Sequence, residues 1–239
     1  MKINAEGMHF KTLGDQIRRC EDETIEIDNV LGQRFLASGL SGKTITICGT
    51  PGNALAAYLD GCNILVKGNC QEAAGDTMNS GTLVIDGSCG DACGYAMRGG
   101  KIFVRENAGY RAGIHMKQFE NKRPALVIGG CAGSFLGEYQ AGGLIVVLNL
   151  SDEQCPVGNF CGTGMHGGKI YIRCLAPPEN LPGQVACRPC DEEGLAEIAP
   201  LVNEFCAWFS ADAKQILSAN FYVLTPNTKN PYKKLYTPN

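Results

Sequence analysis

The stretch that decides the fold runs from Gly75 to Gly87 and reads GDTMNSGTLVIDG. It joins a Gly-x-x-Met-x-x-Gly segment to a short apolar run that is rich in β-branched residues. The stretch from Gly94 to Val104, GYAMRGGKIFV, repeats the same pattern. A fixed period of this kind is typical of stacked units, because one unit alone cannot bury its apolar face.

Further copies extend the repeat in both directions. The glycines that open the apolar runs, Gly42, Gly61, Gly81 and Gly100, are 19, 20 and 19 residues apart. Later copies open at Gly143 and Gly168, and polar inserts at 120–123 and 151–155 lengthen the chain between copies. Because only glycine takes positive φ without strain, we expect these glycines at sharp corners. Gly100→Val should therefore destabilise the fold more than a change at the neighbouring strand position Thr82.

One slot of the repeat holds most of the methionines. Four of the chain's six fall three residues after the first glycine, and a fifth copy has glutamine there. These residues are Met78, Met97, Met116, Met165 and Gln140. We expect the four methionines to form one buried column that Gln140 interrupts, since methionine adapts to narrow interiors.

The repeat predicts a mainly β fold, a right-handed parallel β-helix of about seven coils with short helical N-terminal and C-terminal caps. Residues 1–31 are expected to form an N-terminal cap with a short helix at 11–21. Residues 32–174 form the repeat. Residues 175–239 are expected to hold a loop, helices at 195–209 and 211–219, and an extended tail from 221.

Composition limits the function. The 239 residues carry 21 basic and 24 acidic side chains, so the basic patch of a nucleic-acid-binding protein is not expected. No apolar run is long enough to cross a bilayer, and no secretory signal is visible. The 13 cysteines, an odd number, indicate reduced thiols and a cytoplasmic protein.

Cysteines supply the chemical candidates. Cys70, Cys89 and Cys131 each lie two residues after a glycine that closes a strand, and we expect them as free thiols in the interior. Cys187 and Cys190 form a CxxC pair just before a predicted helix start, where a thiol pKa can be lowered. They are the only metal or redox candidates, with Cys155, Cys161 and Cys174 as further donors. A packed pair is the preferred interpretation, because no second CxxC exists.

Other motifs are explained by the repeat. The segment 162–167, GTGMHG, matches a dinucleotide-binding pattern, but a strand follows it rather than a helix. His115 and His166 occupy different slots, which argues against a metal site built from stacked histidines. No acidic pair recurs on one face, as a polysaccharide-cleaving β-helix would need. Lys43, Lys101 and Lys169 are expected to form an exposed basic stripe, either solvated or used for docking.

These motifs resemble a known family. The repeated Gly-x-x-Met-x-Gly-Gly-x-Ile pattern is similar to the GXGXG β-helix domain, which is the C-terminal domain of the glutamate synthase large subunit. It also forms the third subunit of formylmethanofuran dehydrogenase. The entry segment Asn29–Arg34 and the tail 221–226, FYVLTP, resemble the glutamate synthase branch. The chain resembles that domain as a stand-alone subunit.

The resemblance implies a non-catalytic structural or docking subunit of a glutamate-synthase-like complex. A glutaminase-type amidotransferase and an FMN-binding synthase are then the expected partners, with FMN and iron–sulfur clusters held on them. No catalytic, cofactor-binding or metal site is expected in this chain, nor contact with nucleic acid or membrane, and self-association is left open. The alternatives are a scaffold like the third subunit of formylmethanofuran dehydrogenase and an independent metal or redox protein that uses Cys187 and Cys190.

Overall fold

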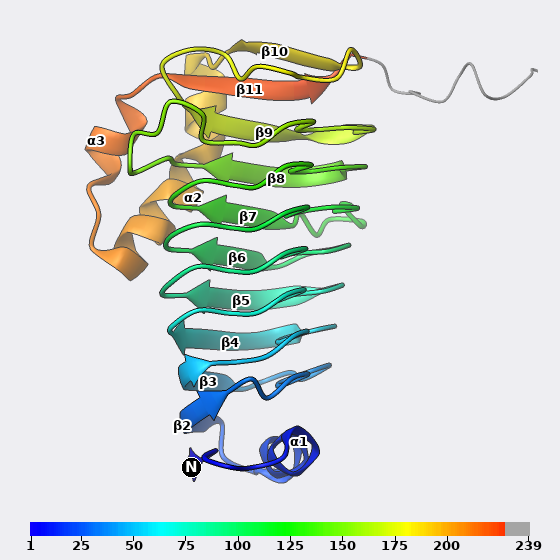
Figure 1. Cartoon of the computed structure of the whole chain (residues 1–239), viewed down its shortest axis with the longest axis vertical. Coiled ribbons are helices and arrows are strands. Elements are labelled where there is room, and N and C mark those ends of the chain that lie inside the picture. The colour runs from blue at the N-terminus through cyan, green and yellow to red at the C-terminus, as the bar shows by residue number, and fades with distance from the viewer. Residues whose placement is uncertain (228–239) are drawn as a thin grey trace, which may run out of the picture.

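The computed structural model describes residues 1–227, and all strands of this part of the chain belong to one long sheet (Figure 1). The strands are β1 (Lys2–Asn4), β2 (Thr24–Leu31), β3 (Thr44–Thr50), β4 (Asp60–Lys67), β5 (Ser80–Ile85), β6 (Lys101–Val104), β7 (Ala125–Ile128), β8 (Ala141–Val147), β9 (Gly167–Arg173), β10 (Val185–Pro189) and β11 (Phe221–Pro226). The helices are α1 (Phe10–Arg19), α2 (Glu192–Phe209) and α3 (Ala213–Leu217).

The strands follow one another through the sheet in chain order until the last three. The order is β1 to β9, then β11, then β10. Every pair from β1–β2 to β8–β9 is parallel, whereas β9–β11 and β11–β10 are antiparallel. The antiparallel end makes β10 an edge strand, and Pro189 on it cannot donate to a further strand.

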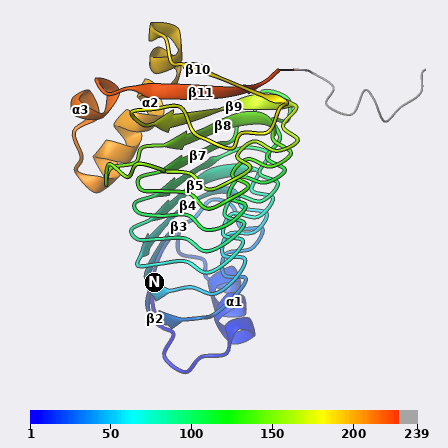
Figure 2. The same ribbon diagram turned by 45° about the horizontal axis from the view of Figure 1, so that its top comes forward.

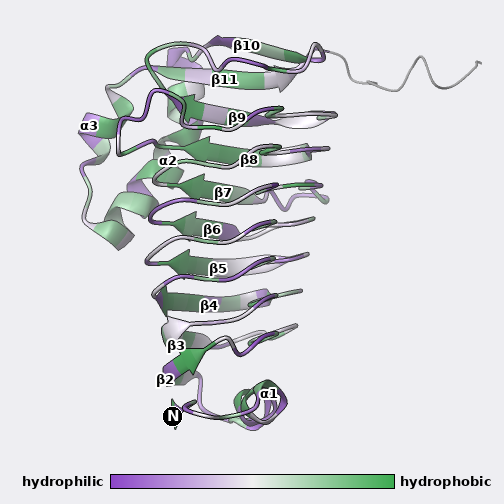
Figure 3. Ribbon diagram, in the orientation of Figure 1, coloured by the Kyte–Doolittle hydropathy of each residue, from purple (hydrophilic) through white to green (hydrophobic). Residues whose placement is uncertain are grey.

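The register places like residues of successive repeats side by side. One inward column, all fully buried, consists of Ile45, Ile64, Leu83, Ile102, Leu126, Ile145 and Ile170. Two residues further along each strand, a second buried column runs from Ile27 through Ile47 to Ile172. Strand residues two apart share one face of a sheet, so these two columns form the core behind it. Figure 3 shows hydrophobic residues concentrated on these strands.

The segments that return from one strand to the next are stacked turns (Figure 2). In the turn before β5, Ala73, Gly75 and Thr77 have φ of 57°, 71° and 51°, while the residues between them do not have positive φ. The turn before β6 repeats this alternation at Ala92, Gly94 and Ala96. Each turn bonds to its neighbour, as in Gly75 N–H to Leu55 O and Gly94 N–H to Ala74 O, both 2.8 Å. We call one strand together with the turn before it a rung.

The prediction of a right-handed parallel β-helix of about seven coils is wrong. The described residues form a single mixed sheet that is not closed. The turns that lead from one strand to the next form only isolated backbone β-bridges, such as the one between Cys70 and Cys89. The physical reason lies in the turns, because a backbone that alternates between positive and negative φ cannot extend into a second strand. The repeat itself is present, but it builds one sheet backed by turns.

The predicted helices are confirmed, with small shifts at their ends. α1 buries Leu13 and Ile17 against the core at the N-terminal end, where a helix was expected at 11–21. α2 and α3 match the helices expected at 195–209 and 211–219. Of the expected extended tail, 221–226 is β11, and 228–239 lie outside the described residues. Within the described part, no helix is long and apolar enough to cross a membrane.

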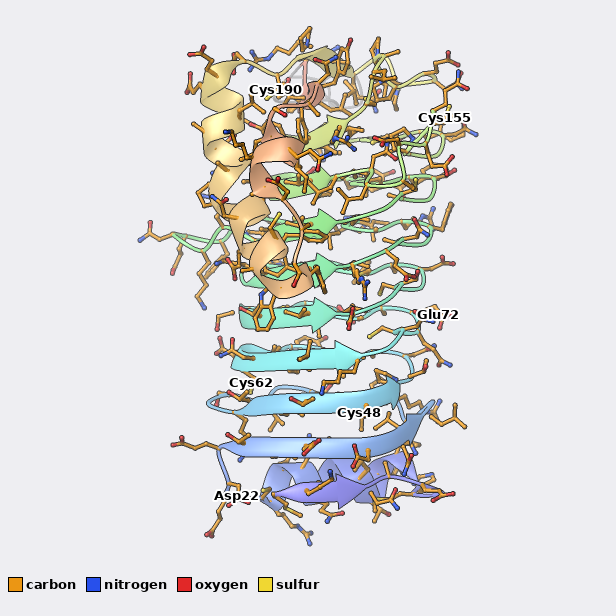
Figure 4. The ribbon with its side chains drawn as sticks, turned by 90° about the vertical axis from the view of Figure 1, so that its left-hand side faces the viewer. Asp22, Cys48, Cys62, Glu72, Cys155 and Cys190 are labelled. Carbon is orange, nitrogen blue, oxygen red and sulfur yellow. The ribbon has the colours of Figure 1, made fainter. Side chains whose placement is uncertain are left out.

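α2 covers the outer face of the later strands (Figure 4). The outward column starts with Thr46 and Leu65 and becomes fully apolar at Val84, Phe103 and Val127. The side chains of α2 that meet this column, Ile198, Val202 and Phe205, are completely buried. The strands under α2 are therefore apolar on both faces, as expected for a sheet that is covered on both sides.

The methionine column is confirmed. Met78, Met97, Met116 and Met165 are all fully buried, and Gln140 in the same slot is buried as well. Gln140 satisfies its amide N–H groups by donating to the carbonyl oxygens of Gly142 and Gly143, both at 3.2 Å. The expected interruption at Gln140 is wrong, because this residue is buried in the same slot and its amide N–H groups are satisfied there.

The cysteine column is only partly as predicted. Cys70 and Cys89 are buried free thiols whose backbones form an isolated β-bridge, but the next residues in that column are Ala108, Ala132 and Val157. Cys131 lies one residue out of register and is half-buried beside Asn149. The glycine equivalent to Gly68 and Gly87 is Gly130 rather than Gly129, because it lies two residues after the strand residue Ile128, so counting two residues from Gly129 gives the wrong position.

The predicted exposed basic stripe is only partly present, because Lys101 and Lys169 share a register column with 44% and 35% of their side chains exposed, but Lys43 does not join them. Lys43 donates to the carbonyl oxygens of Cys20 and Asp22, and it is Thr44 that shares a register column with Lys101. Lys101 forms an ion pair with Glu204 of α2 at 2.5 Å. Lys169 pairs with Glu197 at 2.8 Å. These lysines attach flanking segments to the sheet rather than face a partner.

Glu197 is the centre of the polar attachment of α2. Its carboxylate accepts from Lys169, from the hydroxyl of Tyr171 and from Arg123, whose Nη2 lies 2.5 Å away. Burial alone would raise the pKa of Glu197, but these three hydrogen bonds outweigh it and lower the pKa to about 2. Burial and the bond to Glu197 raise the pKa of Tyr171. The charged form of Glu197 is therefore stabilised by folding.

We expect Glu197→Gln to reduce the free energy of unfolding by about 2 kcal/mol at pH 7, because three donors lose a charged acceptor. The folded pKa is depressed, so this stability is present above the ordinary value of 4.5 and is lost as the pH falls towards about 2. Urea unfolding of both proteins across this range measures the difference. Glu204→Gln, which breaks one partly exposed pair, should cost under about 1 kcal/mol. A difference between wild type and Glu197→Gln that does not change with pH would contradict this.

Candidate functional site

Cys187 and Cys190 lie at the C-terminal end of the sheet and do not form an activated thiol pair. Cys187 is on the edge strand β10 and packs partly against the interior cluster. Cys190 precedes Asp191, the residue that caps α2 by accepting from Gly194 N–H at 2.9 Å. Burial raises the pKa of both thiols, and the Asp191 carboxylate raises that of Cys190 further. The helix N-terminus therefore does not lower the pKa of either thiol, as the sequence had suggested it could.

Cys161 and Cys174 lie near Cys187, but among the described residues the proposed thiol donors do not complete a metal-ligand group with the pair. Cys161 and Cys174 are buried, which raises their pKa values to about 12 and about 11, and Cys155 is exposed. Figure 4 places Cys190 beside α2 and Cys155 near the opposite edge of the molecule. No group of three metal-ligand atoms within 4.8 Å of one another includes these cysteines in the described residues.

The group that does meet this distance is Glu26, Asp28 and Cys48, near the N-terminal end. The ammonium group of Lys2 already lies 3.1 Å from Asp28 and 3.6 Å from Glu26. Burial, followed by the hydrogen bond to Asp28, raises the pKa of the Cys48 thiol. Lys2 thus offsets one of the two negative charges of the cluster, Lys67 lies nearby, and the cluster indicates an ion-pair network rather than a metal site.

The glycine motif at 162–167 lies in a turn, as expected. Gly162 and Gly164 have φ of 72° and 67°, and the segment leads directly into β9. A dinucleotide would need a helix at this point to bind its pyrophosphate. The motif is therefore another turn of the stack.

The candidate functional site is a shallow cleft on the turn side of the molecule, with a volume of about 560 Å³. Two neighbouring columns of the turns line it. The residues directly after the methionine slot are Arg98, Lys117, Ala141 and His166, and their backbone N–H groups bond rung to rung at 2.7–2.9 Å. The residues directly before that slot are Ala96, His115 and Tyr139, with Tyr95 beside them.

Aromatic rings form one wall of the cleft. The rings of His115 and Tyr139 stack with centroids 5.0 Å apart and planes 11° apart. Tyr95 meets His115 edge-on at 5.9 Å. His115 and His166 do occupy different slots, yet they line the same cleft, because the two slots flank one buried methionine position. Residues of adjacent columns can therefore form one site even when no single column supplies all of its residues.

A second group of aromatic side chains, which we call the aromatic ladder, lies in the same stacked turns. It consists of Tyr110, Phe135 and Phe160, with ring centroids 5.4 Å and 5.0 Å apart. Arg111 lies over the rings of Tyr110 and Phe135 and pairs with Glu138 at 2.8 Å. Tyr110 and Phe160 remain 39% and 50% exposed, so the ladder presents apolar surface to solvent.

The chain belongs to the GXGXG motif family, which matches residues 17–229. A curated relative, an uncharacterized protein of Methanocaldococcus jannaschii, is 45% identical over 250 residues, which cover 99% of this chain and 96% of the relative. A similar solved structure is a chain of the formyltransferase/hydrolase complex FhcABCD from Methylorubrum extorquens, in complex with methylofuran. It aligns with a TM-score of 0.67 and 20% identity, over 90% of this chain and 84% of that chain.

Sequence reasoning did not identify the cleft or the aromatic ladder. The signal was present in the repeat alignment, where Arg98, Lys117 and His166 share one slot. The cleft is not apparent from any one histidine or lysine, because it is formed by neighbouring slots on successive rungs.

Proposed function

We propose that this chain is a non-catalytic structural subunit that holds partner subunits together in a multi-subunit enzyme complex. The observation that carries the proposal is the exposed aromatic ladder. Clustered apolar side chains on a protein surface are typical of protein interfaces, and Tyr and Phe are enriched there. The opposite, sheet side of the later rungs is already covered by α2, so the turn side is the face left for a partner.

A complex that handles formyl groups is the context we favour. The similarity in fold to a chain of the formyltransferase/hydrolase complex supports a scaffold of the formylmethanofuran dehydrogenase type. In that setting the partners carry the chemistry and this chain sets their positions. An architecture filled by apolar side chains suits such a role, because a rigid stack keeps a constant distance between docked subunits.

A second candidate is a glutamate-synthase-type complex. The tail segment FYVLTP at 221–226, which forms β11, favours it. The partners would then be a glutaminase-type amidotransferase and an FMN-binding synthase subunit with an iron–sulfur cluster. The two candidates share the same role for this chain and differ in the enzymes it would hold.

Affinity purification of the tagged chain from the organism that encodes it tests the proposal. We expect partner subunits to copurify in fixed ratio, and their identification by mass spectrometry decides between the two complexes. The double variant Tyr110→Ser with Phe160→Ser should lose these partners while its unfolding curve stays close to that of wild type. Leu31→Ser, at an 83% exposed leucine far from the ladder, is the matched control and should keep them.

The isolated chain supplies the other half of this test. We expect it to show no glutaminase, glutamate synthase or formyl-transfer activity and to purify without flavin. Turnover of glutamine by the pure chain, or equal partner recovery with the ladder variant, would overturn the proposal.

A further inference from the structure

We infer that the cleft lined by Arg98, Lys117 and His115 binds a small anionic ligand that carries phosphate or carboxylate groups. The inference goes beyond the scaffold role and does not depend on it, because the cleft is formed within this chain alone. Three features of the cleft support it: its shape, its charge and its aromatic wall.

The hollow results from two alanines that stand beside large side chains in these columns. Ala96 lies below His115 and Tyr139 in one column, and Ala141 separates Lys117 from His166 in the next. Like positions on adjacent rungs are about 4.8 Å apart, so each large side chain normally covers its neighbour. Each alanine leaves a gap, and the resulting volume of about 560 Å³ lies within the range of small-molecule sites.

The charge in the cleft is of one sign. Arg98 and Lys117 line it, and no Asp or Glu does. Within residues 1–227, neither of these two side chains takes part in an ion pair. Glu138, an acid in the same turns, is 5% exposed and is held by Arg111. Two cations on adjacent rungs therefore line the cleft without an ion-pair partner among the described residues, and charge-assisted bonds to an anion are the strong ones.

Arg98 is also oriented for such a ligand. Its Nε donates to the carbonyl oxygen of Ala96 at 3.2 Å, which fixes the Nε side of the guanidinium group. The remaining guanidinium N–H groups can then bind two oxygens of a phosphate or carboxylate. Lys117, one rung further, adds a point charge on the same side.

The aromatic wall defines the shape of the ligand. Because His115 and Tyr139 are stacked and Tyr95 holds His115 edge-on, the wall is flat and its rings are fixed by their neighbours. A compact ligand with two or more anionic groups can lie along the basic column with its apolar part against these rings. A nucleic acid is not favoured, since the whole chain has a net charge of −3.

Isothermal titration calorimetry of the full chain with pyrophosphate and with citrate, at low ionic strength, tests the inference. We expect saturable binding of one ligand per chain, and the two probes distinguish a phosphate site from a carboxylate site. Arg98→Gln with Lys117→Gln should weaken binding by at least roughly tenfold. Ala141→Leu, which fills the hollow and changes no charge, should weaken it by a similar factor.

The double variant Lys11→Gln with Arg19→Gln is the matched control. It also removes one lysine charge and one arginine charge, but from α1 at the other end of the chain. It should leave the affinity within about twofold. An equal loss with this control would mean non-specific charge attraction and would overturn the inference. So would the absence of saturable binding of either probe, or unchanged binding by Ala141→Leu.

Discussion

Replacing Gly81 with valine is expected to destabilise the protein by about 3–5 kcal/mol, through backbone strain and overpacking together. Gly81 has φ of +95°, a conformation that a β-branched residue rarely adopts. A Cβ there would also lie 2.2 Å from the carbonyl oxygen of Cys62 on the preceding rung. That oxygen is part of the rigid backbone, so neither strain nor overlap can be relieved without moving a neighbouring strand.

Chemical unfolding of Gly81→Val beside Thr82→Val measures this effect. Thr82 is the next residue, lies on the half-buried face of β5 and receives the same side chain. Because valine suits a strand, the control should change the free energy of unfolding by less than about 0.5 kcal/mol. Equal effects at the two positions would show that the corner does not require glycine.

The second large effect is expected at Met97. Met97→Ala should cost about 2–5 kcal/mol, because it opens a cavity inside the stack that the fixed rungs cannot close. Met97 is fully buried, and its sulfur lies 3.0 Å from the position a Cβ on Gly94 would take. Met78 and Met116 lie in the same column on the rungs either side of it, and their alanine variants should respond similarly.

Met97→Leu separates loss of volume from loss of methionine itself. Leucine nearly conserves the volume, so this variant should cost less than about 1.5 kcal/mol. Equilibrium unfolding in urea measures all four variants. If the three alanine variants each change stability by less than about 0.5 kcal/mol, the methionine column is not a packed part of the core.

The repeat was visible in the sequence because it depends on local rules. Glycine at a fixed offset, a β-branched run and one recurrent methionine are enough to predict the strands, their register and the buried column. The sheet arrangement was not predictable in the same way. The segment from Ala73 to Thr77 forms a turn because Ala73 and Thr77 adopt positive φ. Alanine and threonine have no intrinsic preference for positive φ, so the sequence does not indicate this.

The positions of side chains outside the core were harder to predict. Lys169 and Lys101 looked like an exposed stripe because the helix that pairs with them begins at Glu192, far along the chain. The outward run Val84, Phe103 and Val127 was the available signal that something covers those strands, since an exposed face would be polar. Cys131 was misplaced because two glycines follow Ile128, and the second of them, Gly130, is the one equivalent to the closing glycines of the other rungs.

The inserts show how length is controlled in this molecule. Residues between Met116 and Ala125 leave the stack as a short loop in which Phe119 and Lys122 bridge, and the register resumes with Lys101 opposite Ala125. Added residues therefore widen a turn without displacing any later strand. Only a complete rung changes the end-to-end distance, by about 4.8 Å each. The length of the molecule can therefore change only by whole rungs.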